Sequence, residues 1–391
     1  MNNLKRYILK SVSYNIVLLF ITGGIIQNFF SYLGFSSSQI GTYISMTNVA
    51  QIVVMILGIV FVDRISNPKK TCSVLVLNSI AFCLAMLFFC FFKGIPTNII
   101  FISAMIFGAF VSLLNGFESI LAYRLPYQVI DMHEFEKGQN LTGIVGGIIS
   151  VVITSLISVF STVIDFSYII AVGFTVSLIF CIVASVTCKR MTEIKKIPKS
   201  DKFKLSKLKK RVFLYFYFPN FIRGCATAIV MMMPVIFVSE ITDNPAKLSA
   251  MNIAYAIAGI VSSVIYRAIG NRLRSKTVFL IGAVITFVSL PMAVVGKSSI
   301  IFFIFYLFGG MGNTMLSVAS AIYATEIVGA DDIGAFSSLK MIFLLAGQAV
   351  SSFVIGKVIG KIPVFVLILV FVSFMLLSGI LHYVYKPSKA E

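Results

Sequence analysis

The sequence is poor in charged residues and has no tryptophan. Charged residues make up 12% of its 391 residues, whereas a soluble globular domain carries about 25%. Hydrophobic residues make up 59%, and the mean hydropathy is +1.00. This composition excludes the soluble class and indicates a membrane protein. We expect tyrosine to occupy the interfacial positions that tryptophan usually fills.

Residues that bind metals or carry redox chemistry are also scarce. The chain has two histidines and six cysteines, and no two cysteines have the Cys-x-x-Cys spacing of zinc and redox sites. The cysteines lie in or beside apolar runs, where they behave as small apolar side chains. No G-x-x-x-x-G-K-S/T sequence occurs, which argues against direct ATP coupling. The sequence therefore predicts no cofactor, no metal site and no enzymatic activity.

Acidic residues are few, 14 against 32 Lys and Arg, which gives a net charge of +18. Eleven of the basic residues lie within 189–211, and most others lie in short loops between apolar runs. This distribution is typical of the positive-inside rule, whereas a nucleic-acid-binding face gathers its charge on one surface. We expect the lipid bilayer and a small molecule as partners, no nucleic acid, and a monomer.

What the chain does contain is long apolar runs. A helix needs about 20 apolar residues to cross a bilayer core. The sequence predicts an all-α, polytopic membrane protein with about twelve transmembrane helices. The predicted spans are 8–31, 38–62, 71–92, 98–122, 139–163, 166–188, 212–238, 247–270, 277–296, 299–325, 333–356 and 361–385.

The basic segment divides these spans into two sets of six. We predict an N-terminal half at 1–188, a basic cytoplasmic linker at 189–211 and a C-terminal half at 212–391. Lys and Arg are concentrated in the loops that share a side with both termini, so the positive-inside rule places both termini in the cytoplasm. We expect a multi-pass protein of the cell membrane, specifically a bacterial cytoplasmic membrane.

A few polar side chains interrupt the predicted spans. Polar groups inside a bilayer are costly, so each one indicates a candidate solute or ion pathway. Some share a helix face: Asn115 and Glu118 are three positions apart, and Asn15, Thr22 and Phe29 follow at intervals of seven. We predict that the pathway is lined by Asn15, Asn115, Glu118, Asn220, Arg223, Asn313 and Lys340.

Glu118 is the sharpest of these candidates. A partly desolvated carboxylate can carry a proton through a transport cycle; alternatively, Glu118 pairs with Arg124 or meets water. Arg223 can hold an anionic group of the solute, or Glu118, or it can extend to the interface. His382, near the end of the last span, is expected at the membrane interface.

The stretch 129-VIDMHEFEKGQNLTG-143 gathers three acids and a histidine between the fourth and fifth spans. If it were helical, Asp131 and Glu134 would share one face while His133 lay on another, so the groups do not converge as they do in H-E-x-x-H. We therefore expect a wet cytoplasmic loop, with Gly138 at the turn into the fifth span.

Two features resemble the major facilitator superfamily. One is the pair of six-helix halves. The other is 58-GIVFVDRISNPKK-70, which resembles the G-x-x-x-D-R/K-x-G-R/K-R/K loop after helix two, with 271-NRLRSK-276 in the corresponding loop of the second half. The resemblance implies a cytoplasmic gate that includes Asp63, Arg64 and Arg272; alternatively, these are ordinary positive-inside charges that Asp63 balances. It also implies that helices one, four, seven and ten line a central cavity.

The acidic stretch resembles the D-Y-x-E-x-x-T-G-x-R-x-x-G loop of the glycoside–pentoside–hexuronide:cation symporters, the melibiose permease-like family. The matching residues are Asp131, Glu134, Gly138 and Gly143. This resemblance implies that Asp131 and Glu134 belong to the cytoplasmic gate and that Lys340 is the lysine of helix eleven. The second span departs from the family because it has no acid before Asp63, which puts the family's usual sodium site in doubt.

These observations predict a secondary active transporter that works by alternating access. Its expected cargo is a small polar solute, with a sugar or glycoside favoured and a proton or sodium as the candidate coupling ion. Efflux of drugs or other amphipathic compounds, and lysolipid flipping, are the alternatives. A membrane enzyme would need a convergent His, Asp and Glu set, and a sensor would need a loop long enough for a soluble output domain.

Overall fold

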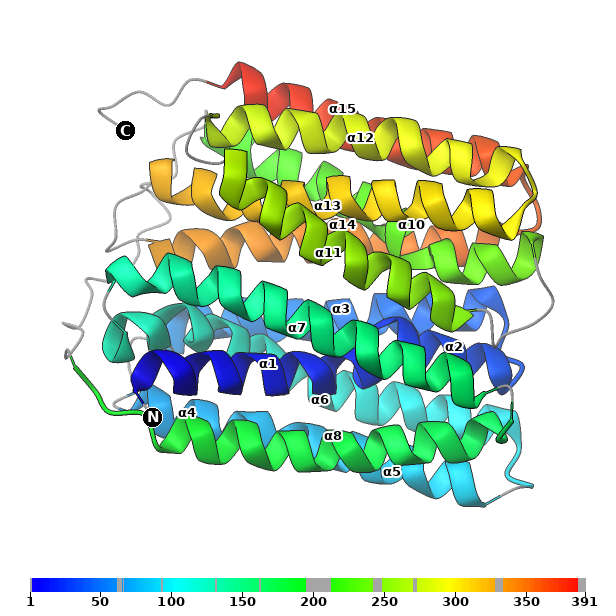
Figure 1. The fold of residues 1–391 in the computed structure, drawn as a ribbon, viewed down its shortest axis with the longest axis horizontal. Coiled ribbons are helices and arrows are strands. Elements are labelled where there is room, and N and C mark those ends of the chain that lie inside the picture. The colour runs from blue at the N-terminus through cyan, green and yellow to red at the C-terminus, as the bar shows by residue number, and fades with distance from the viewer. Residues whose placement is uncertain are drawn as a thin grey trace.

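The computed structural model describes residues 2–61, 65, 67–92, 94–130, 132–161, 163–194, 212–241, 248–269, 273–327 and 333–385. The described backbone is helical almost throughout (Figure 1). It contains no strand, and an isolated bridge joins Ile359 to Ile362. The predicted all-α class is therefore confirmed.

The helices follow one another with short connections. The first half contains α1 (Asn3–Ile21), α2 (Gly24–Tyr32), α3 (Ser37–Phe61), α4 (Pro68–Leu75), the short η2 (Val76–Asn78), α5 (Ser79–Phe91), α6 (Thr97–Val129), α7 (Met132–Phe160) and α8 (Phe166–Lys189). The second half contains the π-helical turn η4 (Phe213–Tyr217), α10 (Phe218–Glu240), α11 (Leu248–Ile269), α12 (Ser275–Val295), α13 (Ser299–Ile327), α14 (Ile333–Val358) and α15 (Val364–Val384).

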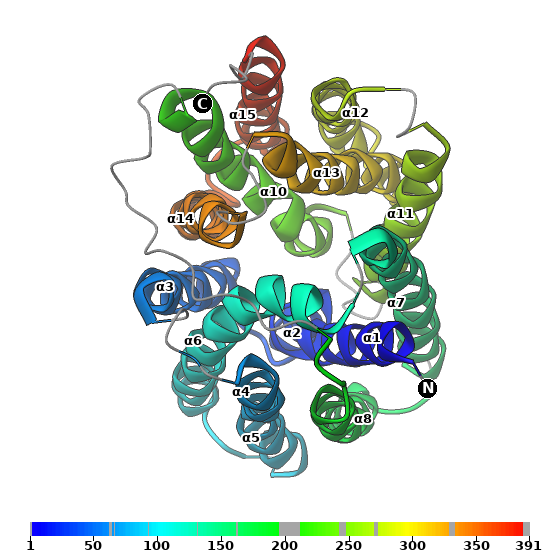
Figure 2. The same ribbon diagram turned by 90° about the vertical axis from the view of Figure 1, so that its left-hand side faces the viewer.

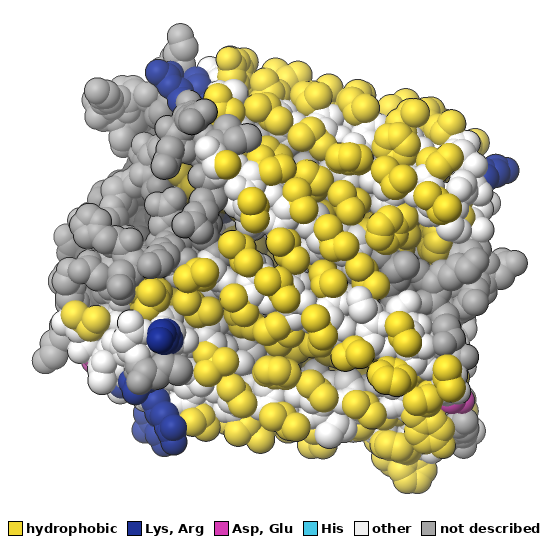
Figure 3. Space-filling model, viewed as in Figure 1, with side chains coloured by type: hydrophobic (Ala, Val, Ile, Leu, Met, Phe, Trp, Pro, Cys, Tyr) yellow, Lys and Arg dark blue, Asp and Glu magenta, His cyan; other side chains and the backbone are white. Residues whose placement is uncertain are grey.

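Most of these elements are long and apolar enough to cross a membrane. Eleven such segments occur in the described chain, and α11 adds a shorter apolar stretch, Met251–Tyr266. Figure 3 shows apolar side chains covering this flank of the bundle, with basic side chains mainly at its left end and a small group at its right end. The molecule has the architecture of a multi-pass membrane protein, with eleven candidate spans and one shorter apolar helix in the described chain against the prediction of about twelve.

The most extensive packing between the halves is that of α3 on α14 and of α7 on α11 (Figure 2). Glycines bring α3 and α14 into backbone contact. A β-carbon at Gly41 would lie 2.5 Å from Ser352 O, and one at Gly356 would lie 2.8 Å from Ser37 O. Small residues allow this close approach between membrane helices.

The first predicted span is not one continuous helix. The chain leaves the helix at Thr22 and Gly23, whose backbone N–H groups both donate to Leu18 O at 2.9 and 3.0 Å. Two consecutive glycines disfavour helix, and a threonine hydroxyl bonded to a preceding carbonyl promotes a bend. The predicted stripe of Asn15, Thr22 and Phe29 is wrong, because Phe29 belongs to the separate helix α2.

The expected loop between the fourth and fifth spans is almost entirely helical, which corrects the prediction. α6 continues through Pro126, and α7 begins at Met132, so Gly138 lies inside α7. The Glu, Lys and Gln residues of this stretch are good helix formers. Gly138 has a packing role, since a β-carbon there would lie 3.0 Å from Leu4 Cδ1 of α1.

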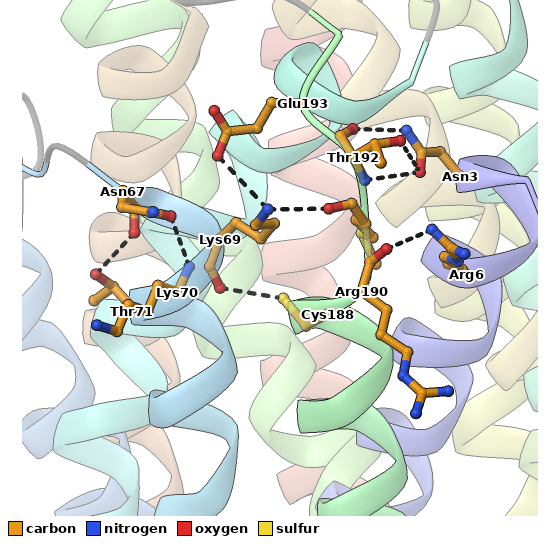
Figure 4. A network of polar contacts seen from close by, with 11 residues as sticks. Asn3, Arg6, Asn67, Lys69, Lys70, Thr71, Cys188, Arg190, Thr192 and Glu193 are labelled. Atoms are coloured by element: carbon orange, nitrogen blue, oxygen red, sulfur yellow. Dashed lines mark hydrogen bonds and ion pairs between the residues drawn. The ribbon is translucent and has the colours of Figure 1, made fainter.

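The beginning of the predicted linker is attached to the first half (Figure 4). Asn3 Nδ2 donates to Thr192 O at 2.7 Å, and Thr192 N donates back to Asn3 Oδ1 at 3.0 Å. Lys69 Nζ donates to Met191 O at 3.0 Å and lies 3.8 Å from Glu193 Oε1. The chain just after α8 is thereby tied to α1 and α4, while 195–211 lies outside the described residues.

Candidate functional site

The first half contains a buried ion pair. Lys10 of α1 and Glu118 of α6 are each 4% exposed, and Lys10 Nζ donates to Glu118 Oε1. Cys72 of α4, fully buried, donates its thiol to the same oxygen at 3.2 Å. Three helices therefore meet at one carboxylate, which is the candidate predicted from the sequence.

One helical turn further along α1, Tyr14 donates its hydroxyl to Asn115 Oδ1 at 3.0 Å. Lys10 Nζ lies 5.5 Å from the centre of the Tyr14 ring, within the range of a cation–π contact. The structure thus brings Asn115 and Glu118 to one cluster, on the face their spacing predicts. We call Lys10, Cys72, Asn115, Glu118 and Tyr14 the ion-pair cluster.

Three members of this cluster, Lys10, Tyr14 and Cys72, are not among the residues predicted from the sequence. Lys10 stands with Lys5 and Arg6 at the start of the first apolar run, and its charge alone does not single it out from them. A usable signal was present, since Lys10 and Tyr14 are four positions apart and face the same way on a helix. The missed partner matters, because it supplies the counter-charge that allows Glu118 to be buried.

The charge of the Glu118 carboxylate controls one contact between α1 and α6. A buried carboxylate can be neutralised by a proton, and protonation would remove its attraction for the ammonium group of Lys10. The Tyr14–Asn115 hydrogen bond joins the same two helices, so the ion pair is one of two polar links between α1 and α6. A change of charge on Glu118 would therefore alter, but not remove, the contact between α1 and α6.

The second half contains a polar cluster with no described acid. Asn220 of α10 is fully buried, and its Nδ2 donates to Phe216 O at 2.7 Å. Ser320 of α13 donates to Asn220 Oδ1 at 3.5 Å, and Lys340 of α14 donates to Ser320 O at 3.5 Å. His382 Nε2 lies 3.5 Å from Asn220 Nδ2.

Arg223 and His382 both lie close to one aromatic ring in this cluster. The guanidinium carbon of Arg223 lies 5.9 Å from the centre of the Phe279 ring, and the His382 imidazole stacks on the same ring at 4.3 Å. Arg223 is 5% exposed and His382 is fully buried. The expectation of an interfacial His382 is wrong: its Nδ1 lies 2.9 Å from Ser378 O, which gives it a partner inside the bundle.

The two clusters occupy equivalent places in their halves. Glu118 and Ser320 each lie 21 positions after the first residue of α6 and α13. Glu118 contacts Lys10 of α1, and Ser320 contacts Asn220 of α10. The ion pair of the first half thus corresponds to a neutral Asn–Ser contact in the second. Only the first half carries a carboxylate at this position.

The remaining predicted residues are dispersed. Asn313 of α13 is buried, and its Nδ2 donates to the hydroxyl of Tyr255 on α11 at 2.9 Å. Asn15 is exposed on α1. Glu134 falls in the first turn of α7, but its side chain lies outside the described part. The other predicted gate residues also lie outside the described residues: Asp63, Arg64, Asp131 and Arg272.

The described residues include no group of three or more His, Cys, Asp or Glu side chains arranged to hold a metal ion. The six cysteines are free and buried. The described residues contain the ion pairs Lys10–Glu118 and Lys69–Glu193.

No protein-family model and no curated protein matches the chain. Solved structures do match. The nucleoside transporter NupG is similar with a TM-score of 0.66 and 14% identity over 99% of this chain and 100% of that chain. A mutant of NupG has a TM-score of 0.69 and 15% identity over 98% and 100%.

The D-xylose–proton symporter is similar with a TM-score of 0.70 and 11% identity over 99% of this chain and 98% of that chain. Identities this low concern the fold, and the melibiose permease-like subfamily stays a prediction. The chain has the major facilitator fold, as its sequence predicts.

Proposed function

We propose that the protein is a secondary active transporter that moves a small polar solute across the bacterial cytoplasmic membrane by alternating access. The observation that carries this proposal is the burial of ionisable and amide side chains inside both halves of a major facilitator fold. Such groups are costly in a membrane and are characteristic of solute and ion pathways. The proposal includes cytoplasmic termini, a monomer and no cofactor or enzymatic activity.

A proton is the favoured coupling ion, with Glu118 as its carrier. This assignment is supported by the buried contact between Glu118 and Lys10, which a proton can break. Sodium is less favoured, because the second span has no acid before Asp63. The gate of Asp63, Arg64, Asp131, Glu134 and Arg272, as well as the division at 188 and 212, remains part of the proposal.

A sugar, glycoside or nucleoside is the favoured cargo. NupG is a nucleoside transporter and the other similar structure is a D-xylose–proton symporter; both names denote uncharged, hydroxylated solutes. The loop resemblance to the glycoside symporters points the same way. Efflux of amphipathic compounds and lysolipid flipping are less favoured, because buried amides such as Asn28 and Asn313 suit a polar solute better than an acyl chain.

Counterflow exchange in proteoliposomes tests this function. Vesicles are loaded with unlabelled D-xylose, uridine or methyl-β-D-glucoside, and entry of the same labelled solute is followed. We expect transient accumulation of at least one of them, and none in protein-free vesicles. Export of a lipophilic dye or flipping of a labelled lysolipid, with no exchange of any of the three solutes, would assign the protein to an alternative class.

A further inference from the structure

We infer that the break between α1 and α2, together with Gln27, Asn28 and Asn252, forms a binding site for an uncharged hydroxylated group of the solute. The inference rests on the proposed transport function and assigns residues to its substrate site. None of these three amides belongs to the ion-pair cluster or to the cluster around Asn220.

The break brings α2 against the second half. α2 contacts α10 and α11, and at Gly24 the approach is so close that a β-carbon would lie 1.9 Å from Asn252 Oδ1 of α11. Gln27 and Asn28 follow Gly24 by three and four positions, so all three share one face of α2. The two amides of α2 therefore lie on the face that meets Asn252.

Each of these amides has one buried polar atom without a described partner, although Asn252 as a whole is half-buried. Gln27 is 4% exposed and Asn28 is 1% exposed. Among the described residues, no hydrogen-bond partner reaches Gln27 Oε1, Asn28 Oδ1 or Asn252 Nδ2. Buried polar atoms are normally satisfied by protein or water, so unsatisfied ones in a membrane protein call for an explanation. A bound solute would supply the missing partners.

The polar row continues from Asn252 into the second half. Tyr255 lies three positions along α11, on the same face, and accepts a hydrogen bond from Asn313 at 2.9 Å. Asn313 Oδ1 is itself buried without a described partner. The row thus runs from α2 across the boundary between the halves to α13, which is where solutes bind in transporters built from two repeats.

The chemistry of the row selects the ligand. Gln27, Asn28 and Asn252 are uncharged, and each amide offers both donors and an acceptor. A hydroxyl group also donates and accepts, so it can satisfy either end of an amide. A charged group would be left without a counter-charge at these three side chains. Sugar and ribose hydroxyls fit this requirement.

The test replaces the amides with leucine, which has a similar volume, in Gln27→Leu, Asn28→Leu and Asn252→Leu. Wild-type protein is first assayed for counterflow of D-xylose, uridine and methyl-β-D-glucoside, and for thermal stabilisation by each. With the solute that responds, we expect each variant to raise KM at least tenfold and to lose the solute-induced rise in melting temperature. The melting temperature without solute should stay equal or rise, because unsatisfied buried amides are removed.

Asn98→Leu is the matched control, since Asn98 is exposed in the first turn of α6; it should keep the wild-type KM. Variants that transport and are stabilised like wild type would overturn the site while leaving the proposed function intact. Variants that melt at a lower temperature without solute but keep the wild-type KM would also overturn the site, because the amides would then have a structural role. If no probe is transported by wild type, the proposed function fails, and the site fails with it.

Discussion

At the scale of single residues, the ion pair between Lys10 and Glu118 decides what the first half can do. Both side chains are buried, so each depends on the other to compensate its charge. Removing one partner of a buried pair costs about 3–5 kcal/mol, whereas replacing both with apolar residues is often neutral. A single substitution of Lys10 or Glu118 therefore affects stability as well as the proposed proton coupling. Replacing both with apolar residues removes the proposed proton carrier with little loss of stability.

We predict that Lys10→Met and Glu118→Leu each lower the unfolding free energy by about 3–5 kcal/mol. The double variant should recover most of this loss, because no unpaired charge remains. A double-mutant cycle on the detergent-solubilised protein measures the coupling. Additive losses in the double variant would mean that the two side chains do not stabilise each other.

Single residues also show which contacts cannot be predicted from the sequence. Glu118 and Asn115 were found because their polarity stands out in an apolar helix and their spacing places them on one face. The partners of Glu118 were missed because pairing between α1, α4 and α6 is a tertiary relation. A thiol such as Cys72 is compatible with apolar packing, so nothing in the sequence marked it as a donor to a carboxylate.

At the scale of helices, close packing depends on glycine. α10 and α14 approach each other so closely that a β-carbon at Gly224 would lie 2.0 Å from Leu344 O, and one at Gly347 would lie 2.1 Å from Phe221 O. These contacts are with backbone atoms, which cannot rotate away. By contrast, Gly259 of α11 has no atom within 4 Å of the position of a β-carbon.

We predict that Gly224→Ala and Gly347→Ala each destabilise the protein by about 1–3 kcal/mol, the usual cost of overpacking. Gly259→Ala is the control and should be neutral or stabilising by up to about 1 kcal/mol, the difference in helix propensity. Thermal unfolding followed by circular dichroism makes the comparison. Equal melting temperatures for all three variants would contradict the close packing of α10 and α14.

Helix positions followed from hydropathy, but helix ends and breaks did not. The spans 299–325 and 333–356 agree with α13 and α14 to within two residues at each end, because long apolar runs leave little choice. The break at Thr22 and Gly23 was missed because hydropathy does not register backbone conformation. The helical start of α7 was missed because charged residues near a span suggest a loop, although they favour helix.

At the scale of the whole molecule, sidedness is the simplest consequence of the arrangement. The start of α1 and the end of α15 lie at the same end of the bundle (Figure 1). Glu193 follows α8 at that end, while Lys297 lies in the turn between α12 and α13; both residues are exposed. From the positive-inside rule we propose that the end with Glu193 faces the cytoplasm.

We predict that the Glu193→Cys variant reacts with a membrane-impermeant maleimide only from the cytoplasmic side. The Lys297→Cys variant should react only from the outside. The native cysteines are buried, so they should not react with the maleimide and need not be replaced for this experiment. Labelling in whole cells and in inverted vesicles gives the comparison. Reaction of both positions from one side would contradict the proposed topology.

The central claim is proton-coupled solute transport. It rests on a fold of two halves, the first of which contains the buried carboxylate of Glu118. Gradient-driven uptake in proteoliposomes tests it most directly, with the solute that exchanges in counterflow and with Glu118→Gln as the comparison. The account predicts that an inward proton gradient drives wild-type protein to concentrate the solute. The variant should still exchange solute but not concentrate it, with exchange insensitive to pH. Uphill uptake by Glu118→Gln with an unchanged pH profile would contradict the account.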